Sequence, residues 1–302
     1  MLQCRALIFA AVASSLVCAA SAQAQNAVPV PIDALPPPPP PPNARIEYQN
    51  LYYTDPTVAA PGAWLFGFNA EAWGIYFPQL NATARVSGTA VSGTATEAGW
   101  EAGGSAFIGY DNFLLQVTGL AGTGTANVSY ADGLKSNTSA GITEVEVIGR
   151  YVFPSMQFGG VTPYFLAGYD FTETNTKTTD STGFTFVLSG TSQLNSINTY
   201  NTVFAGLGAL YEFTPAAGLR FDLEAGPAFG HTRYTNADVV TGADNKGVGV
   251  AGMSHLTLYW KLTEEWTAQV GAKAAGIANQ NNGVQAWSAT GGFVSLGYQH
   301  RF

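Results

Sequence analysis

The chain has 302 residues and a formal net charge of −8, and only 11% of its residues are charged. The charged fraction is well below the roughly 25% of an average soluble domain, and the acidic balance argues against nucleic acid as a partner. No run of about 18 apolar residues follows the N-terminal segment, so no transmembrane helix is predicted. The length suits one large all-β domain or two ordinary domains.

Residues 1–24 have the features of a secretory signal peptide. Arg5 precedes a short apolar stretch that ends in an Ala-Gln-Ala cleavage site at residues 22–24. An N-terminal membrane helix is the alternative, but the apolar core is short for one. Both cysteines, Cys4 and Cys18, lie in this segment. Cleavage would therefore leave a chain without thiols, and the loss of Arg5 would give a net charge of 11 − 20 = −9.

Residues 25–61 form a proline-rich region, with seven consecutive prolines at 36–42. Proline has no N–H to donate to a sheet and favours polyproline II, in which the chain advances about 3.1 Å per residue as a semi-rigid spacer. We therefore interpret this region as a leader that precedes the folded domain, residues 62–302.

Stretches with a period of two residues alternate with polar breaks from Trp64 to the end of the chain, a pattern typical of strands. Ten strands are predicted, at residues 64–77, 97–110, 113–128, 140–153, 161–174, 198–213, 219–234, 247–262, 266–279 and 287–302.

The connections between these strands alternate in length. Four are short and mostly made of turn-forming residues, at 111–112, 154–160, 214–218 and 263–265. The intervening ones, such as 78–96 and 175–197, are mostly longer and rich in Thr, Ser, Asn and Gly. This alternation predicts an all-β fold, an up-and-down antiparallel transmembrane β-barrel with turns at one end and loops at the other.

Charged and bulky apolar side chains fall on opposite faces of the predicted strands. In the fourth strand, Val145 and Val147 alternate with Glu144 and Glu146. A soluble β-sandwich would also alternate, but here aromatic residues gather near the short turns, where a membrane barrel has an interfacial girdle. We expect twelve charged residues to face the interior: Glu71, Glu144, Glu146, Arg150, Asp170, Glu212, Arg220, Asp222, Glu224, Lys261, Lys273 and Arg301.

A barrel of about ten strands is too narrow for a wide aqueous pore, so we expect side chains to fill most of its interior. The inward charges would then pair with one another or be wetted, because a buried charge without a partner is costly. Acids outnumber bases in this set, so a remaining water path would prefer cations.

The last strand carries the most specific signal. Val294, Leu296, Tyr298 and Phe302 share one face, interrupted only by His300, and the chain ends on an aromatic residue. This segment resembles the closing strand of Gram-negative outer-membrane β-barrels, a superfamily that includes small porin-like and opacity-like proteins. The resemblance implies an outer-membrane location in contact with lipid, and it implies that Tyr298 and Phe302 form the signal read by the barrel-assembly machinery.

The same resemblance bears on the leader, because some small barrels with proline-rich N-termini are joined there to peptidoglycan. Residues 25–61 are then expected on the periplasmic side of the first strand. Two alternatives stand: a spacer that reaches peptidoglycan, or a solvated leader with no partner.

No catalytic, cofactor or metal site is expected. The omptin proteases have barrels of this size and use Asp and His near the outer rim, but the candidates here, His231, Asp238 and Asp244, include no Asp-x-His pair. Ser254 and His255 are adjacent in a strand, so their side chains point to opposite faces. No loop carries His or carboxylates at metal-ligand spacing.

Two functions remain: a structural or surface protein that anchors the envelope or self-associates through its outer loops, and a narrow, mildly cation-preferring channel. In segment 175–197, Phe184, Phe186 and Leu188 share one face and form a candidate contact surface. This segment either extends the fifth and sixth strands above the membrane or folds inward as a plug. We favour the extension, because a plug in an acidic interior should carry Lys or Arg.

Overall fold

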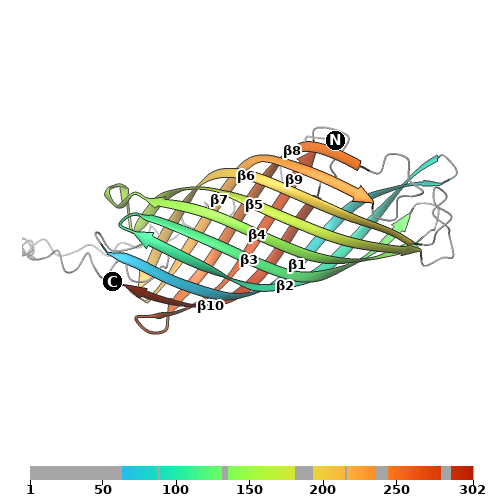
Figure 1. The fold of residues 1–302 in the computed structure, drawn as a ribbon. Helices are drawn as coiled ribbons and strands as arrows, with labels where there is room; N and C mark the ends of the chain where they lie inside the picture. Colours follow the sequence, from blue (N-terminus) through green and yellow to red (C-terminus); the bar gives the residue numbers. More distant parts are fainter. Residues whose placement is uncertain are drawn as a thin grey trace, which may run out of the picture. The chain divides into compact units, whose positions relative to one another are not determined.

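The structure is a computed structural model. In the residues that it describes, ten antiparallel strands close into a barrel (Figure 1). The described residues are 63–86, 89–130, 135–180, 193–214, 216–234, 244–279 and 287–301. The strands are β1 Trp64–Val86, β2 Thr89–Tyr110, β3 Phe113–Tyr130, β4 Lys135–Val152, β5 Val161–Asp180, β6 Gln193–Thr214, β7 Ala217–Tyr234, β8 Asp244–Lys261, β9 Trp266–Asn279 and β10 Trp287–Arg301. The predicted signal peptide and leader lie outside these residues.

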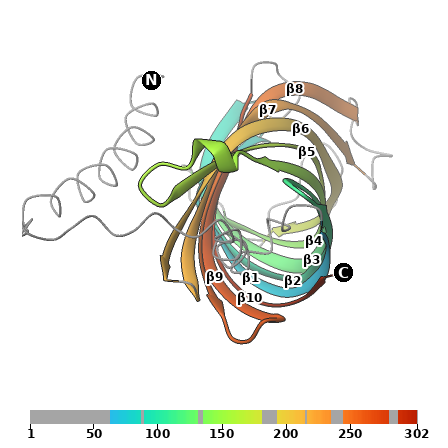
Figure 2. The ribbon, with the colours of Figure 1, turned by 90° about the vertical axis from the view of Figure 1, so that its left-hand side faces the viewer.

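Each strand pairs with its neighbours in sequence, and the first strand pairs with the last. The closing ladder between β1 and β10 runs from Leu65 opposite Arg301 to Tyr76 opposite Thr290. Figure 2 looks toward one end of the barrel and shows the strands following one another around the ring. The predicted fold class is therefore confirmed. Among the described residues, no helix has the length and apolar character needed to cross a membrane.

The short connections form tight turns, and we call their side of the barrel the turn end. Asp111 has a positive φ of 53°, a conformation that Asp tolerates better than most side chains, and the N–H of Val152 donates to the carbonyl of Asn112 at 2.9 Å. The connection from β4 to β5 contains a 3-10 helix, η1 Pro154–Met156, and positive-φ glycines at Gly159 and Gly160.

The opposite side, the loop end, differs from the prediction. Segment 78–96 was expected to be a long connection, but β1 continues to Val86 and β2 begins at Thr89. The pairing register shifts between Phe77 and Leu80, on either side of Pro78, because proline has no N–H to donate and is accommodated at a bulge. β5 extends to Asp180 and β6 begins at Gln193, so both ends of segment 175–197 lengthen these strands, as the favoured extension predicts; residues 181–192 lie outside the described residues. The sequence pattern ended these strands too early because polar residues dominate them here.

The polarity of the barrel is inverted relative to a soluble protein. Apolar residues on the outward face are widely exposed, for example Leu207 at 67% and Val294 at 60%. Charged residues on the inward face are buried, with Asp222 at 0% and Glu224 at 2% exposure. An apolar outer surface over a polar interior is stable only where the outer surface meets lipid.

Aromatic residues mark the two edges of this apolar surface. At the turn end, Trp64 contacts Tyr110 with ring centroids 4.8 Å apart, and Trp266 contacts Tyr298 at 5.3 Å. On the outward face of β2, Trp100 precedes Tyr110 by ten residues. At about 3.3 Å per residue and a tilt of roughly 40°, these two rings are about 25 Å apart along the barrel axis. That separation matches the apolar band of an outer-membrane barrel.

Several inward-facing rings lie over glycines directly opposite them on the neighbouring strand. Tyr164 faces Gly208, where an added Cβ would lie 2.1 Å from the ring. Phe204 covers Gly168 in the same ladder, where the corresponding distance is 2.5 Å. The same arrangement joins Phe107 to Gly67, Phe293 to Gly271 and Tyr259 to Gly218. The glycines leave room for these rings next to the wall, where the rings occupy part of the interior.

Candidate functional site in the barrel interior

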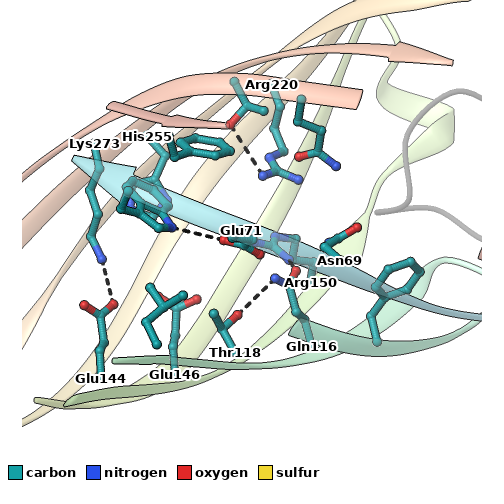
Figure 3. A pocket seen from close by; sticks show the side chains of 16 residues that line it. Asn69, Glu71, Gln116, Thr118, Glu144, Glu146, Arg150, Arg220, His255 and Lys273 are labelled. Atoms are coloured by element: carbon teal, nitrogen blue, oxygen red, sulfur yellow. Dashed lines mark hydrogen bonds and ion pairs between the residues drawn. The ribbon is translucent and has the colours of Figure 1, made fainter. Parts of the chain in front are cut away.

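Eight of the twelve charged residues predicted to face the interior lie on the inward faces of four strands. Glu144, Glu146 and Arg150 belong to β4, Arg220, Asp222 and Glu224 to β7, Lys261 to β8 and Lys273 to β9. The period of two places each group on one face, and closure of the barrel brings these faces toward one another. Figure 3 shows that most of these side chains converge on one cavity.

An ion pair crosses the interior from wall to wall. Lys273 Nζ lies 3.0 Å from Glu144 Oε1 (Figure 3). Their strands, β9 and β4, are five places apart around the ring in either direction, so the pair spans the barrel. Both side chains are largely buried, at 18% and 15% exposure. This contact divides the interior and narrows any continuous path.

A second group of contacts joins β1 to β2 on one side and to β10, β9 and β8 on the other. Trp73 Nε1 donates to Glu71 at 3.2 Å, and Ser105 donates to the other oxygen of Glu71 at 3.1 Å. The Trp73 ring stacks on Phe293 at 4.3 Å and lies 6.4 Å from the ring of His255. Lys273 Nζ lies 5.9 Å from the Trp73 centroid, within cation–π range.

The arginines fix the next layer of the interior. Arg150 donates to Gln116 at 2.7 Å (Figure 3), and Arg220 Nε lies 3.5 Å from Asp222 Oδ2. The Tyr164 hydroxyl donates to the other oxygen of Asp222. A fully buried carboxylate thus accepts a hydrogen bond from a phenol on β5 and forms an ion pair with an arginine of its own strand.

Carboxylates are in excess in the interior. Glu144, Glu146 and Asp170 form one close group, and Asp222, Glu224 and His255 form another. Among inward-facing residues with described side chains, there are eight carboxylates and five Lys or Arg, so the balance is 5 − 8 = −3. The predicted absence of metal sites rested on spacing within loops, whereas both groups lie on strands.

Two inward groups were absent from the predicted set of lumen charges. Glu101 on β2 is buried at 3% exposure, and His255 on β8 lines the cavity. Alternation with the outward Trp100 was the signal that would have placed Glu101 inside. The strand pattern was sufficient to place His255 on the inward face. It did not indicate that Asp222 and Trp73 would be its neighbours.

The remaining predicted site residues fall outside this network. Tyr298 lies on the outward face at the turn end, in contact with Trp266 and Phe68. Phe302, and the candidate contact surface of Phe184, Phe186 and Leu188, lie outside the described residues.

Those catalytic candidates that the structure describes lie at separate positions on β7 and β8. Ser254 lies on the outward face of β8 and His255 on the inward face, so they do not form a pair. His231 is opposite Lys246, and Asp244 is opposite Arg233. Asp238 lies outside the described residues.

The inverted polarity, the closed ladder and the aromatic edges occur together in one class of protein. The chain has the fold of an outer-membrane β-barrel. Its outward apolar band is suited to strands that contact lipid.

Comparison with solved structures finds other outer-membrane barrels. The outer-membrane protease OmpT from Escherichia coli is 8% identical, with a TM-score of 0.49, over 82% of this chain and 100% of that one. The translocator domain of the autotransporter NalP from Neisseria meningitidis is 12% identical, with a TM-score of 0.40, over 84% and 95%. The outer-membrane protein OprG from Pseudomonas aeruginosa is 8% identical, with a TM-score of 0.34, over 82% and 99%. Likeness at this level transfers no activity.

No protein-family model matches the chain. No curated protein matches it either.

Proposed function

We propose that this protein is a structural or surface component of the outer membrane whose barrel is closed rather than open. The ion pair between Lys273 and Glu144 carries this proposal, because it links diametrically placed strands through the interior. The stacked pair Trp73 and Phe293 fills the adjoining space. A barrel filled in this way is a rigid anchor for the segments that leave its two ends.

The segments outside the barrel would then carry the biological contacts. The mature chain would begin after Ala24, and the leader at 25–61 would reach peptidoglycan from the periplasmic side. Phe184, Phe186 and Leu188 would associate with another copy of the chain above the membrane. In this proposal the protein is not an enzyme, and the barrel-assembly machinery is its partner only during insertion.

A second candidate, a narrow cation-preferring channel, is favoured by one observation. The interior has three more carboxylates than Lys and Arg among its described inward side chains, and such a lining attracts cations. The two candidates differ in whether the contact between Lys273 and Glu144 is permanent or opens.

Conductance of the purified protein in planar bilayers separates the candidates. We expect the wild type to be silent and Lys273→Met to show small cation-selective events, because the methionine no longer bridges the interior. Lys246→Met is the matched control, since Lys246 lies on β8 outside the cavity lining and its loss removes the same charge. Steady conductance in the wild type would refute the closed barrel and establish the channel.

A further inference from the structure

One interior cluster combines two carboxylates with an imidazole. Asp222 on β7 lies directly opposite His255 on β8, and Glu224 follows Asp222 by two residues on the same inward face. One ligand atom from each of the three residues lies within 4.8 Å of the other two. The barrel wall therefore presents three metal-binding side chains to one point.

Glu224 is unusual among the interior carboxylates. It is only 2% exposed, and neither of its oxygens has a hydrogen-bond partner among the described residues. His255 Nε2 is likewise buried without a hydrogen-bond partner there. Burial of a carboxylate without a partner is strongly unfavourable because the charge loses its hydration. A ligand that contacts both Glu224 and His255 would reduce this desolvation penalty.

The third member of the cluster is already oriented. Tyr164 donates to Asp222, and Arg220 lies beside its other oxygen. On the other side, Trp73 limits the movement of the His255 ring. Partners that hold a ligand side chain in place are typical of metal sites in proteins.

The other acidic group, formed by Glu144, Glu146 and Asp170, differs because it has a lysine partner. Within it, Glu144 is bonded to Lys273 Nζ at 3.0 Å, and Asp170 accepts from Thr172 at 2.9 Å. A lysine therefore already supplies the positive charge that this group requires. In the cluster of Asp222, Glu224 and His255, both oxygens of Glu224 are fully buried and accept no hydrogen bond from the described residues.

We propose that Asp222, Glu224 and His255 bind one divalent transition-metal ion of the Zn²⁺ class inside the barrel. Imidazole with carboxylates suits Zn²⁺, whereas Mg²⁺ and Ca²⁺ prefer oxygen ligands only. Tetrahedral bonds of about 2.0–2.2 Å place ligand atoms roughly 3.5 Å apart, so the side chains need to close in by about 1 Å. The ion would also offset most of the interior's negative charge.

Equilibrium dialysis of the tag-free, detergent-folded barrel tests this site, with Zn²⁺ as the probe and Mg²⁺ as the comparison ion. We expect one Zn²⁺ per barrel and no Mg²⁺ at the same concentration. Glu224→Gln should weaken Zn²⁺ binding by roughly 100-fold or more, because loss of even an outer-shell partner of a metal ligand typically costs about 10- to 100-fold. Failure of the wild type to retain Zn²⁺ would overturn the proposal.

Glu101→Gln is the matched control, because it also removes one buried interior carboxylate but lies outside the cluster. It should weaken Zn²⁺ binding clearly less than Glu224→Gln. Equal weakening would mean that Zn²⁺ responds only to the total interior charge, which would overturn the site. X-ray absorption of the Zn²⁺-loaded wild type keeps the test decisive if a variant does not fold: an imidazole ligand supports the site, and a shell of oxygen alone overturns it.

Discussion

The ring of Tyr164 lies over Gly208, its direct partner across the ladder between β5 and β6. A Cβ at Gly208 would lie 2.1 Å from the ring, and the same phenol donates to Asp222 on β7. One glycine therefore permits a contact that ties three strands together inside the barrel.

Gly208→Ala should displace this ring and destabilise the barrel by about 1–3 kcal/mol, the usual cost of forcing extra volume into a packed interior. Denaturant unfolding of the detergent-folded protein measures the change. Gly141→Ala is the control, because no atom lies within 4 Å of a Cβ at that position, and it should stay within about 0.5 kcal/mol. Equal stability of both variants would show that the ring does not need the glycine.

Removing one partner of the ion pair between Lys273 and Glu144 should destabilise the barrel. We expect about 3 kcal/mol for Lys273→Met, the lower end of the range for buried pairs, because both side chains keep some exposure. Adding Glu144→Gln should recover only part of this loss, since Glu146 and Asp170 remain beside it. Unfolding free energies of the two single variants and the double variant give the coupling, and additive losses would contradict a direct interaction.

Removal of Phe302 should reduce insertion rather than any activity of the folded barrel. The closing strand already packs Tyr298 against Trp266 and Phe68, so the terminal residue is expected to act during assembly. The fraction of heat-modifiable protein in outer membranes is the measurement. Phe158→Ala is a suitable control, because Phe158 is an exposed aromatic at 86% outside the closing strand. An unchanged yield on loss of Phe302 would remove the assembly role.

Deletion of residues 28–42 should leave the melting of the detergent-folded barrel nearly unchanged, because this segment is proposed to lie outside the folded domain. The Lys273→Met variant provides the positive control for a detectable change. In cells, a tethered leader should yield cell-wall digests with peptides that begin near Gln25. Digests without such peptides would eliminate covalent tethering but not the spacer.

Replacement of Phe184 and Phe186 with Ser should weaken association between barrels and leave folding and conductance unchanged. The expected reason is loss of the apolar contact surface proposed above the membrane. Sedimentation of the purified protein measures association, and Val187→Ser on the opposite face is the control. A larger conductance in the double Phe variant would instead identify the segment as a plug, and the channel would then be the better function.

The sequence by itself determined the ten strands and their polarity. The bounds of β9, 266–279, were predicted without error, because turn residues and a strict period of two mark both ends. Glu144 and Glu146 could be placed on one face for the same reason: the direction of a strand side chain depends only on its position parity. At the loop end the prediction stopped short of Val86, because hydrogen bonds of the backbone continue where the side-chain pattern does not.

Only the tertiary structure decided which inward groups meet. Lys273 and Glu144 are 129 residues apart, and their contact follows from the closure and register of all ten strands, which no local pattern contains. The same holds for Tyr164 reaching Asp222 across β6. Parity indicates that a residue faces the interior, but its height and its position around the ring depend on the stagger of the whole barrel, so pairing is a property of the closed sheet.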